Sequence, residues 1–320
     1  MKGAIFRGFS INSRQFFLIF FLIFNSVIWF FTILFSIAWE MPDMWLLPAA
    51  TTISLLIGPL IAERISRMRF LLIWVLLGVI SSLFSLIMPT FIVFIWWGFA
   101  FGIGFPSCLA LVSSLTKVEE RGRIGGVIFF TTYAILPLFA LTIGSLNVLS
   151  SSIPLAVWRV FSFLPLFLLK VDLDAPLKPV TYSSILANKK FLFYFFPWLV
   201  FGLVHFLTWP IIKEFFTESL MLSLTMVESV LGSLLCFIGG SLMDFLGRRR
   251  PILIGFVMLG IGFATLSFFT TAPVAQGFYI AADGIAWGIF SVAFGPVVWG
   301  DIANHQRSDK FYGLGSTPIP

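Results

Sequence analysis

Long apolar runs alternate with short polar segments along the chain. Each run is about 20 residues long, the length of α-helix that crosses a hydrocarbon core about 30 Å thick. The pattern predicts an all-α integral membrane protein with about ten transmembrane helices. The predicted helices lie at residues 16–39, 44–62, 70–88, 91–115, 124–148, 153–169, 191–212, 220–243, 251–270 and 273–299.

One long polar stretch, at residues 171–190, interrupts this pattern. It carries Asp172, Lys178 and two prolines, which is typical of a linker. We therefore expect three parts: an N-terminal six-helix bundle at residues 1–170, the linker, and an incomplete C-terminal bundle of four helices at residues 191–320.

The composition agrees with a membrane protein. The 320 residues are 59% hydrophobic and 11% charged, whereas about a quarter of the residues in a soluble domain are charged. The net charge of +6 comes from Lys and Arg in short loops, with no contiguous basic face. The expected partner is therefore a lipid bilayer and not a nucleic acid.

The distribution of Lys and Arg predicts the orientation. With the N-terminus inside, all 20 except Arg159 and Lys213 fall in cytoplasmic segments, as the positive-inside rule requires. The run at residues 16–39 is too long for a signal-peptide core and lacks a small-residue cleavage site. We expect a multi-pass protein of the cell (plasma) membrane with the linker and both termini in the cytoplasm.

A charged loop separates two of the apolar runs. From Gly240 it reads G-x-L-x-D-x-x-G-R-R and contains Asp244, Gly247, Arg248 and Arg249. The glycines permit tight turns and close backbone approach. A carboxylate at the end of an apolar run is costly without a partner, and the arginines can supply one.

An earlier segment repeats this loop in degraded form. Glu63 replaces the aspartate, Pro59 and Ser66 replace two glycines, and Arg64 and Arg67 keep the basic character. The two copies are about 180 residues apart. Two such matches at nearly one offset indicate internal duplication. The second match pairs Gly98 and Gly102 with Gly284 and Gly288, and residues 123–126 with residues 310–313.

The loop at residues 240–249 resembles the cytoplasmic loop signature of the major facilitator superfamily (MFS), which joins the second and third helices of each six-helix half. The resemblance covers nearly the whole chain. It implies an MFS-like two-bundle helical transporter that moves a small-molecule substrate by alternating access, with proton coupling as one option, and neither an enzyme nor a cofactor. In the family this loop latches the halves together. The implied gating residues are Gly240, Asp244, Gly247, Arg248, Arg249, Glu63, Arg64 and Arg67.

The chain departs from the family in three respects. It lacks the last two helices, and residues 313–320 look like the approach to an eleventh. Gly98 stands nearest to the family's fourth-helix arginine, and the fifth span lacks a G-P-x-x-G-G run. The alternative interpretation is therefore a truncated or split-gene transporter fragment without independent transport, for which a separately encoded segment would supply the missing helices.

Charged residues inside apolar runs are the strongest functional signal, because each is costly in hydrocarbon. Asp283 lies about 14 Å into its predicted helix, near the bilayer midplane. Glu228 lies up to halfway across its own helix. Both are candidates for substrate binding or ion coupling. Arg159 falls near one end of its predicted span, where its side chain could extend outward to the interface.

Two pairs of polar and aromatic residues share helix faces at i, i+4 spacing. They are Asn25 with Trp29 and His205 with Trp209. These pairs could line a substrate pocket, or they could serve helix packing and interfacial anchoring.

A third interpretation, an integral-membrane enzyme, has less support. Such enzymes need clustered Asp, His or Glu, and the sequence shows neither a cluster nor a nucleotide-binding loop. The two cysteines fall inside predicted spans and the two histidines are far apart, so no metal site is expected.

Overall fold

The computed structural model describes residues 10–38, 41–143, 146–169, 178–216, 218–304 and 306–318, without the side chains of residues 209, 213 and 218–225. Residues 171–177 of the expected linker lie outside this set. Helices dominate the described ranges, which contain no β-strand beyond an isolated bridge between Lys178 and Gln306. The all-α prediction is confirmed.

The helical elements follow the predicted apolar runs. They are α1 (Ser13–Thr32), η1 (Ile33–Ala38), α2 (Leu46–Ala62), α3 (Arg67–Phe84), α4 (Thr90–Gly102), α5 (Phe105–Leu115), α6 (Val118–Ile143), α7 (Val148–Val160), α8 (Phe163–Leu168), α9 (Tyr182–Leu186), α10 (Lys189–Ile212), η2 (Lys213–Phe215), α11 (Glu218–Leu246), α12 (Arg249–Phe268), α13 (Pro273–Val292), η3 (Ala293–Val297), α14 (Val298–Ala303) and α15 (Asp309–Ser316).

Nine helical segments among the described residues are long and apolar enough to cross a membrane. The remaining predicted run forms α2, an apolar helix of 17 residues. Four predicted spans consist of successive elements: α1 with η1, α4 with α5, α7 with α8, and α13 with η3 and α14. In η3, Pro296 lacks the N–H that a regular α-helix would use, which accounts for a local change of helical pitch.

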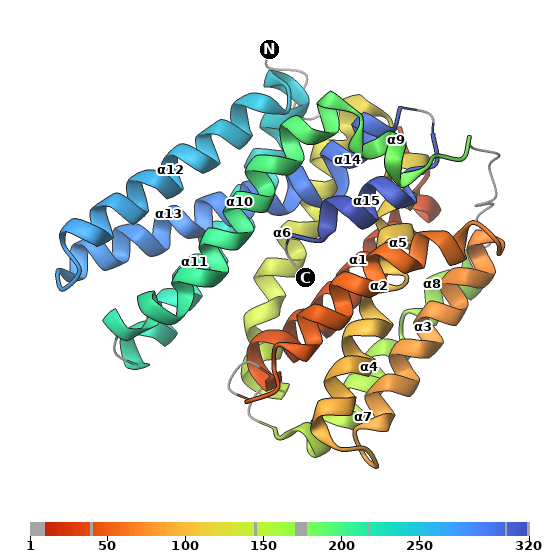
Figure 1. Cartoon of the computed structure of the whole chain (residues 1–320), viewed down its shortest axis with the longest axis horizontal. Coiled ribbons are helices and arrows are strands. Elements are labelled where there is room, and N and C mark those ends of the chain that lie inside the picture. Colours follow the sequence, from red (N-terminus) through yellow and green to blue (C-terminus); the bar gives the residue numbers. More distant parts are fainter. Residues whose placement is uncertain are drawn as a thin grey trace. The chain divides into compact units, whose positions relative to one another are not determined.

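The chain folds into two compact units of interleaved segments (Figure 1). The first unit contains residues 1–10, 116–137 and 193–298, and the second contains residues 11–115, 138–192 and 299–320. In the first unit, α11 and α12 both pack on α13. In the second, α2 packs on α4, α3 packs on α7, and α15 packs on α2 and α5. The bundle boundaries expected at residues 170 and 191 stay a prediction.

Glycines bring helices into backbone contact in both units. A Cβ atom at Gly98 of α4 would lie 2.3 Å from the carbonyl oxygen of Leu47 in α2. A Cβ atom at Gly284 of α13 would lie 2.8 Å from the carbonyl oxygen of Glu228 in α11. Small residues permit this approach between membrane helices. The two glycines that the sequence repeat pairs therefore make the same kind of contact.

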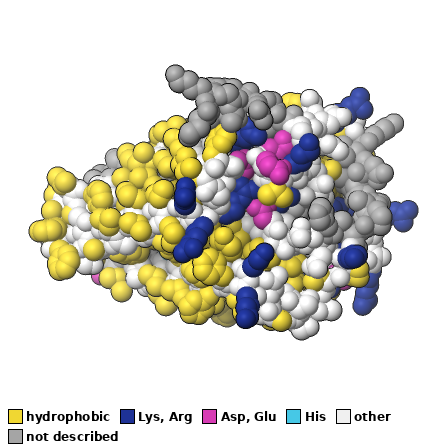
Figure 2. Space-filling view, turned by 90° about the horizontal axis from the view of Figure 1, so that it is seen from above, with side chains coloured by type: hydrophobic (Ala, Val, Ile, Leu, Met, Phe, Trp, Pro, Cys, Tyr) yellow, Lys and Arg dark blue, Asp and Glu magenta, His cyan; other side chains and the backbone are white. Residues whose placement is uncertain are grey.

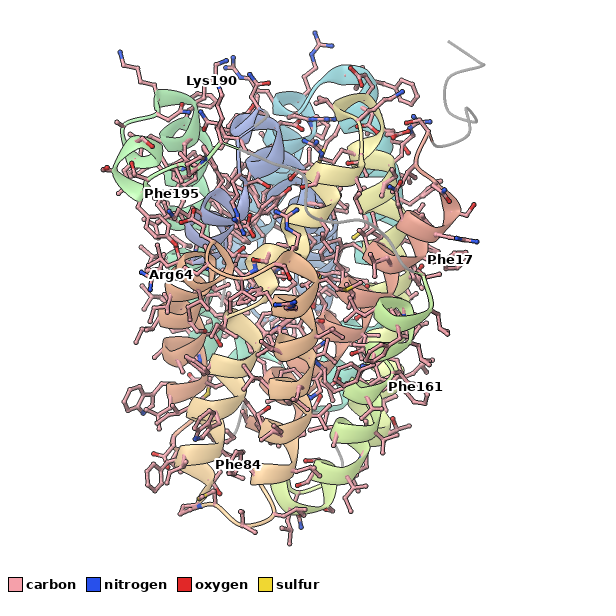
Figure 3. The ribbon with its side chains drawn as sticks, turned by 90° about the vertical axis from the view of Figure 1, so that its right-hand side faces the viewer. Phe17, Arg64, Phe84, Phe161, Lys190 and Phe195 are labelled. Atoms are coloured by element: carbon pink, nitrogen blue, oxygen red, sulfur yellow. The ribbon has the colours of Figure 1, made fainter. Side chains whose placement is uncertain are left out.

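Large apolar side chains cover much of the outer surface. Val274 is 86% exposed and Phe268 is 80% exposed. Figure 2 shows broad apolar areas on one face of the molecule, and Figure 3 shows Phe17 and Phe161 at the outside of their helices. Such a surface suits lipid tails better than water.

The glycine contacts predict a specific sensitivity to added volume. Gly98→Ala should destabilise the protein by about 1–3 kcal/mol, because the new methyl group would overlap a backbone carbonyl that cannot rotate away. Gly260→Ala in α12 is the matched control, since no atom lies within 4 Å of its Cβ position. Thermal unfolding in detergent compares the two variants. Equal melting temperatures would contradict the close contact of α2 and α4.

Candidate functional site

Three of the candidate residues meet inside the first unit. His205 comes from α10, Glu228 from α11 and Asp283 from α13. The Nδ1 atom of His205 lies 3.8 Å from Oδ1 of Asp283, whose side chain is 2% exposed. Glu228 is partly buried and lies within electrostatic range of Asp283. We refer to these three residues as the acid–histidine cluster.

The contact between α11 and α13 explains why the two carboxylates are close. Gly284 follows Asp283 directly and faces Glu228, where a Cβ atom would lie 3.3 Å from Cγ of Glu228. One turn further along, a Cβ atom at Gly288 would lie 2.4 Å from the carbonyl oxygen of Gly232. The glycine face of α13 thus allows α11 to approach closely enough for the two acids to interact.

Aromatic and hydroxyl side chains surround the acid–histidine cluster. The ring of Trp287 lies 5.0 Å from that of His205, centroid to centroid. Tyr133 and Tyr279 lie within electrostatic range of both acids, and the Tyr133 hydroxyl is 2.7 Å from Oγ of Ser291. Sequence reasoning did not find these residues, because aromatic residues are abundant in every span. The sequence feature that could have identified Tyr133 as a site residue is its hydroxyl group, which lies inside an apolar run.

The sequence also predicted Trp209 as a member of this site and no metal. The side chain of Trp209, expected on the same helix face as His205, lies outside the described residues. In the described part of the chain, no group of three or more His, Cys, Asp or Glu side chains could hold a metal ion.

Asn25 and Trp29 belong to the second unit and are buried in helix contacts. The Asn25 amide donates to the carbonyl oxygen of Trp158 in α7 at 2.6 Å. The Trp29 indole donates to Oγ of Ser82 in α3 at 3.0 Å. These bonds tie α1 to α7 and α3. A role of Asn25 and Trp29 in lining a substrate pocket stays a prediction.

The expected outward position of Arg159 is wrong. The helix that carries it begins at Val148, five residues earlier than the apolar pattern predicts, so Arg159 lies near the middle of its span. Its side chain is fully buried. Depth within the span prevents this side chain from reaching the interface.

The charged loop at residues 240–249 forms a compact network with the start of α6. Asp244 accepts hydrogen bonds from the backbone N–H groups of Gly122, at 2.9 Å, and Arg123, at 2.8 Å. It also accepts one from Nη1 of Arg248 at 2.6 Å. Gly247 has a φ of +82°, which favours glycine. The carboxylate thus binds N–H groups in the second turn of α6, near the positive end of its helix dipole.

The other residues of this loop also have identifiable positions. A Cβ atom at Gly240 would lie 2.2 Å from the carbonyl oxygen of Gly122, so glycine is needed for the approach of α11 to α6. The guanidinium of Arg249 lies 5.8 Å from the centre of the Phe193 ring. These contacts fix both ends of the loop within the first unit.

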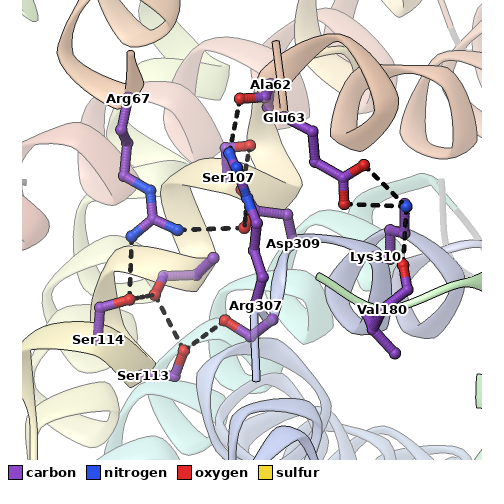
Figure 4. A network of polar contacts seen from close by, with 12 residues as sticks. Ala62, Glu63, Arg67, Ser107, Ser113, Ser114, Val180, Arg307, Asp309 and Lys310 are labelled. Atoms are coloured by element: carbon purple, nitrogen blue, oxygen red, sulfur yellow. Dashed lines mark hydrogen bonds and ion pairs between the residues drawn. The ribbon is translucent and has the colours of Figure 1, made fainter. Parts of the chain in front are cut away.

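The degraded copy forms a network of its own in the second unit (Figure 4). Arg67 contacts Oδ2 of Asp309 at 3.1 Å, and Arg307 contacts the same oxygen at 3.2 Å. Ser107 donates to Oδ1 of Asp309 at 2.6 Å. Asp309 is 1% exposed, so its charge depends on these partners.

A second ion pair lies beside Asp309. Lys310 contacts Glu63 at 2.9 Å and donates to the carbonyl oxygen of Val180 at 2.8 Å. The Tyr182 hydroxyl donates to the carbonyl oxygen of Leu56. Burial, together with the nearby carboxylate of Glu63, raises the pKa of Tyr182, so its hydroxyl remains a donor. Arg64 of the same copy is exposed (Figure 3).

The two networks join the segments that the sequence repeat matches. Asp244 corresponds to Glu63, and Arg123 corresponds to Lys310. Arg123 lies 3.5 Å from Asp244, and Lys310 lies 2.9 Å from Glu63. In each network, the acid of the loop therefore forms an ion pair with a basic residue near the N-terminal end of another helix. The earlier copy adds Asp309 as a second acid.

The contact of Asp244 with α6 can be measured directly. Asp244→Asn should speed amide hydrogen exchange at Gly122 and Arg123 by at least about tenfold, because a hydrogen bond to a charged acceptor contributes about 1.5–3 kcal/mol. Glu119→Gln removes an exposed acid from the same helix and should have little effect. Unchanged exchange in Asp244→Asn would contradict a stabilising role of these hydrogen bonds.

The network around Asp309 predicts a stability effect. Asp309→Asn should lower the free energy of unfolding by about 3–5 kcal/mol, because Arg67 and Arg307 would lose the buried carboxylate that both contact. Asp43→Asn, at an exposed position, should change it little. Chemical denaturation in detergent measures both variants. A small and equal effect would show that the ion pairs contribute nothing.

Comparison with protein-family models and with curated protein sequences finds no match. Solved structures with the same fold include the human organic anion transporter MFSD10 (TETRAN), at TM-score 0.72 and 12% identity over 95% of this chain and 89% of that chain. They also include a bacterial homologue of the iron transporter ferroportin in its outward-facing state, at TM-score 0.70 and 14% identity over 95% of this chain and 88% of that chain. At these identities the similarity is one of fold. The chain therefore shares the fold of these two transporters, which agrees with the MFS-like helical architecture expected from the loop signature.

Proposed function

We propose that this chain is a secondary active transporter of a small solute, working by alternating access and coupled to protons at the acid–histidine cluster. The observation that carries the proposal is the position of Asp283. Its side chain is 2% exposed, 3.8 Å from His205 and within electrostatic range of Glu228.

The chemistry of the cluster favours proton binding. Two carboxylates close together in a medium of low dielectric constant cannot both be ionised cheaply. A proton shared among Glu228, Asp283 and His205 relieves this repulsion. Such a proton can be taken up from one side of the membrane and released to the other when access to the site switches.

The two charged-loop networks support a gating role. Each ties a loop to the start of another helix by ion pairs or charged hydrogen bonds. Contacts of this kind bias a two-state equilibrium, because they exist in one state and break in the other. In this proposal they close the cytoplasmic side, and Asp244→Asn shifts the population toward the inward-open state.

Organic anions and iron are the first solutes to test, because one structural neighbour is named as an organic anion transporter and the other as a homologue of an iron transporter. The distribution of Lys and Arg supports an orientation with both termini cytoplasmic, and the plasma membrane is the location that we propose. A separately encoded partner segment stays a prediction from the family resemblance.

The test is uptake by the purified chain in proteoliposomes with an imposed pH gradient. Radiolabelled monocarboxylates, dicarboxylates and ferrous iron serve as probes. Asp283→Asn keeps the side-chain shape and removes its titration. The variant should retain downhill exchange and lose accumulation driven by the gradient. Glu214→Gln, at an exposed position of the same unit, should accumulate solute like the wild type.

The remaining outcomes separate the alternatives. Normal accumulation by Asp283→Asn would exclude this residue from proton coupling. Failure of both Asp283→Asn and Asp283→Glu to fold would assign the carboxylate to helix packing. Uptake that appears only after a separate helical segment is added would favour the split-gene interpretation.

A further inference from the structure

The second unit encloses one arginine at membrane depth. Arg159 lies near the middle of the span Val148–Leu168, and its side chain is 0% exposed. It sits on α7 and faces α1 and α3. Neither the proposed proton coupling nor the loop networks involve it.

Among the described residues, every group that contacts the Arg159 guanidinium is neutral. Nη1 donates to Oδ1 of Asn25 at 3.3 Å, to Oγ of Ser26, and to Oγ of Ser162 at 3.5 Å. The guanidinium carbon lies 4.4 Å from the centre of the Trp74 ring. These groups orient the cation without neutralising its charge.

Two nitrogens of the guanidinium remain available. Nε and Nη2 are buried and have no hydrogen-bond partner among the described residues. The described acids of this unit are Asp43, Glu63, Asp301 and Asp309. None of them forms an ion pair with Arg159, and Glu63 and Asp309 are held in the loop network.

This arrangement is unfavourable unless an anion completes it. Arginine keeps its proton in proteins. A buried charge without a counter-ion costs more free energy than its cation–π contacts return. Gly78 makes room for the arginine side chain itself, because a Cβ atom there would lie 2.5 Å from Nε.

We propose that Arg159 is the centre of an anion-binding site, in which Nε and Nη2 bind a small monovalent anion. Chloride and the carboxylate group of a small solute share this chemistry. The enclosure of Arg159 by Trp29 and Trp74 restricts the site to small anions. The site lies within the second unit and does not depend on proton coupling.

Thermal unfolding of the full chain in lipid nanodiscs tests the site. The reference anion is gluconate, which is too large for an enclosed site. Chloride or acetate is then substituted for gluconate at constant ionic strength. The melting temperature should rise saturably, by about 2 °C or more, as a bound ligand requires. A response to chloride alone identifies an inorganic anion site, and a response to acetate alone identifies a carboxylate site.

Variants assign the effect to Arg159. Arg159→Met should abolish the anion-dependent rise, whereas Arg69→Met, at an exposed position of α3, should retain it. If Arg159→Met does not fold, Gly78→Ala serves instead, because its methyl group would crowd Nε and should weaken the response at least about tenfold in anion concentration. The absence of any rise in the wild type, or an unchanged rise in Arg159→Met or Gly78→Ala, would overturn the proposal.

Discussion

The constraint on which this structure depends is the cost of a polar group in an apolar medium. A membrane helix has no water to satisfy its charged or hydrogen-bonding side chains, so other parts of the protein must do so. The buried acids Asp283 and Asp309 accordingly lie beside polar or charged partners. Asp283 lies beside His205 and Glu228, and Asp309 lies between Arg67 and Arg307.

The same constraint gives glycine its structural importance. Helices whose backbones touch bring their polar side chains within reach of one another, and small residues such as glycine allow that approach. Gly284 faces Glu228 directly, and Gly240 lets α11 meet the start of α6. The acid–histidine cluster and the Asp244 network are therefore products of helix packing as much as of charge.

The two loop networks show how a duplicated pattern can diverge while keeping its contact. The copy at residues 240–249 uses one carboxylate that binds two backbone N–H groups in the second turn of α6. The earlier copy is held by three ion pairs: Glu63 with Lys310, and Arg67 and Arg307 with Asp309. Of the residues that differ from the motif, Glu63 keeps the acidic function and forms one of these ion pairs.

The sequence by itself determined the all-α membrane class, the approximate positions of the spans and the loop signature, because hydrophobicity and charge along a helix depend on local order alone. It also singled out Glu228 and Asp283 as costly charges within spans, and His205 as a polar residue on one helix face. Only the tertiary structure decided that these three meet, because their distances depend on the packing of α10, α11 and α13. The burial of Arg159 likewise depends on where α7 begins and on the space that Gly78 leaves, which no periodicity in the chain reveals.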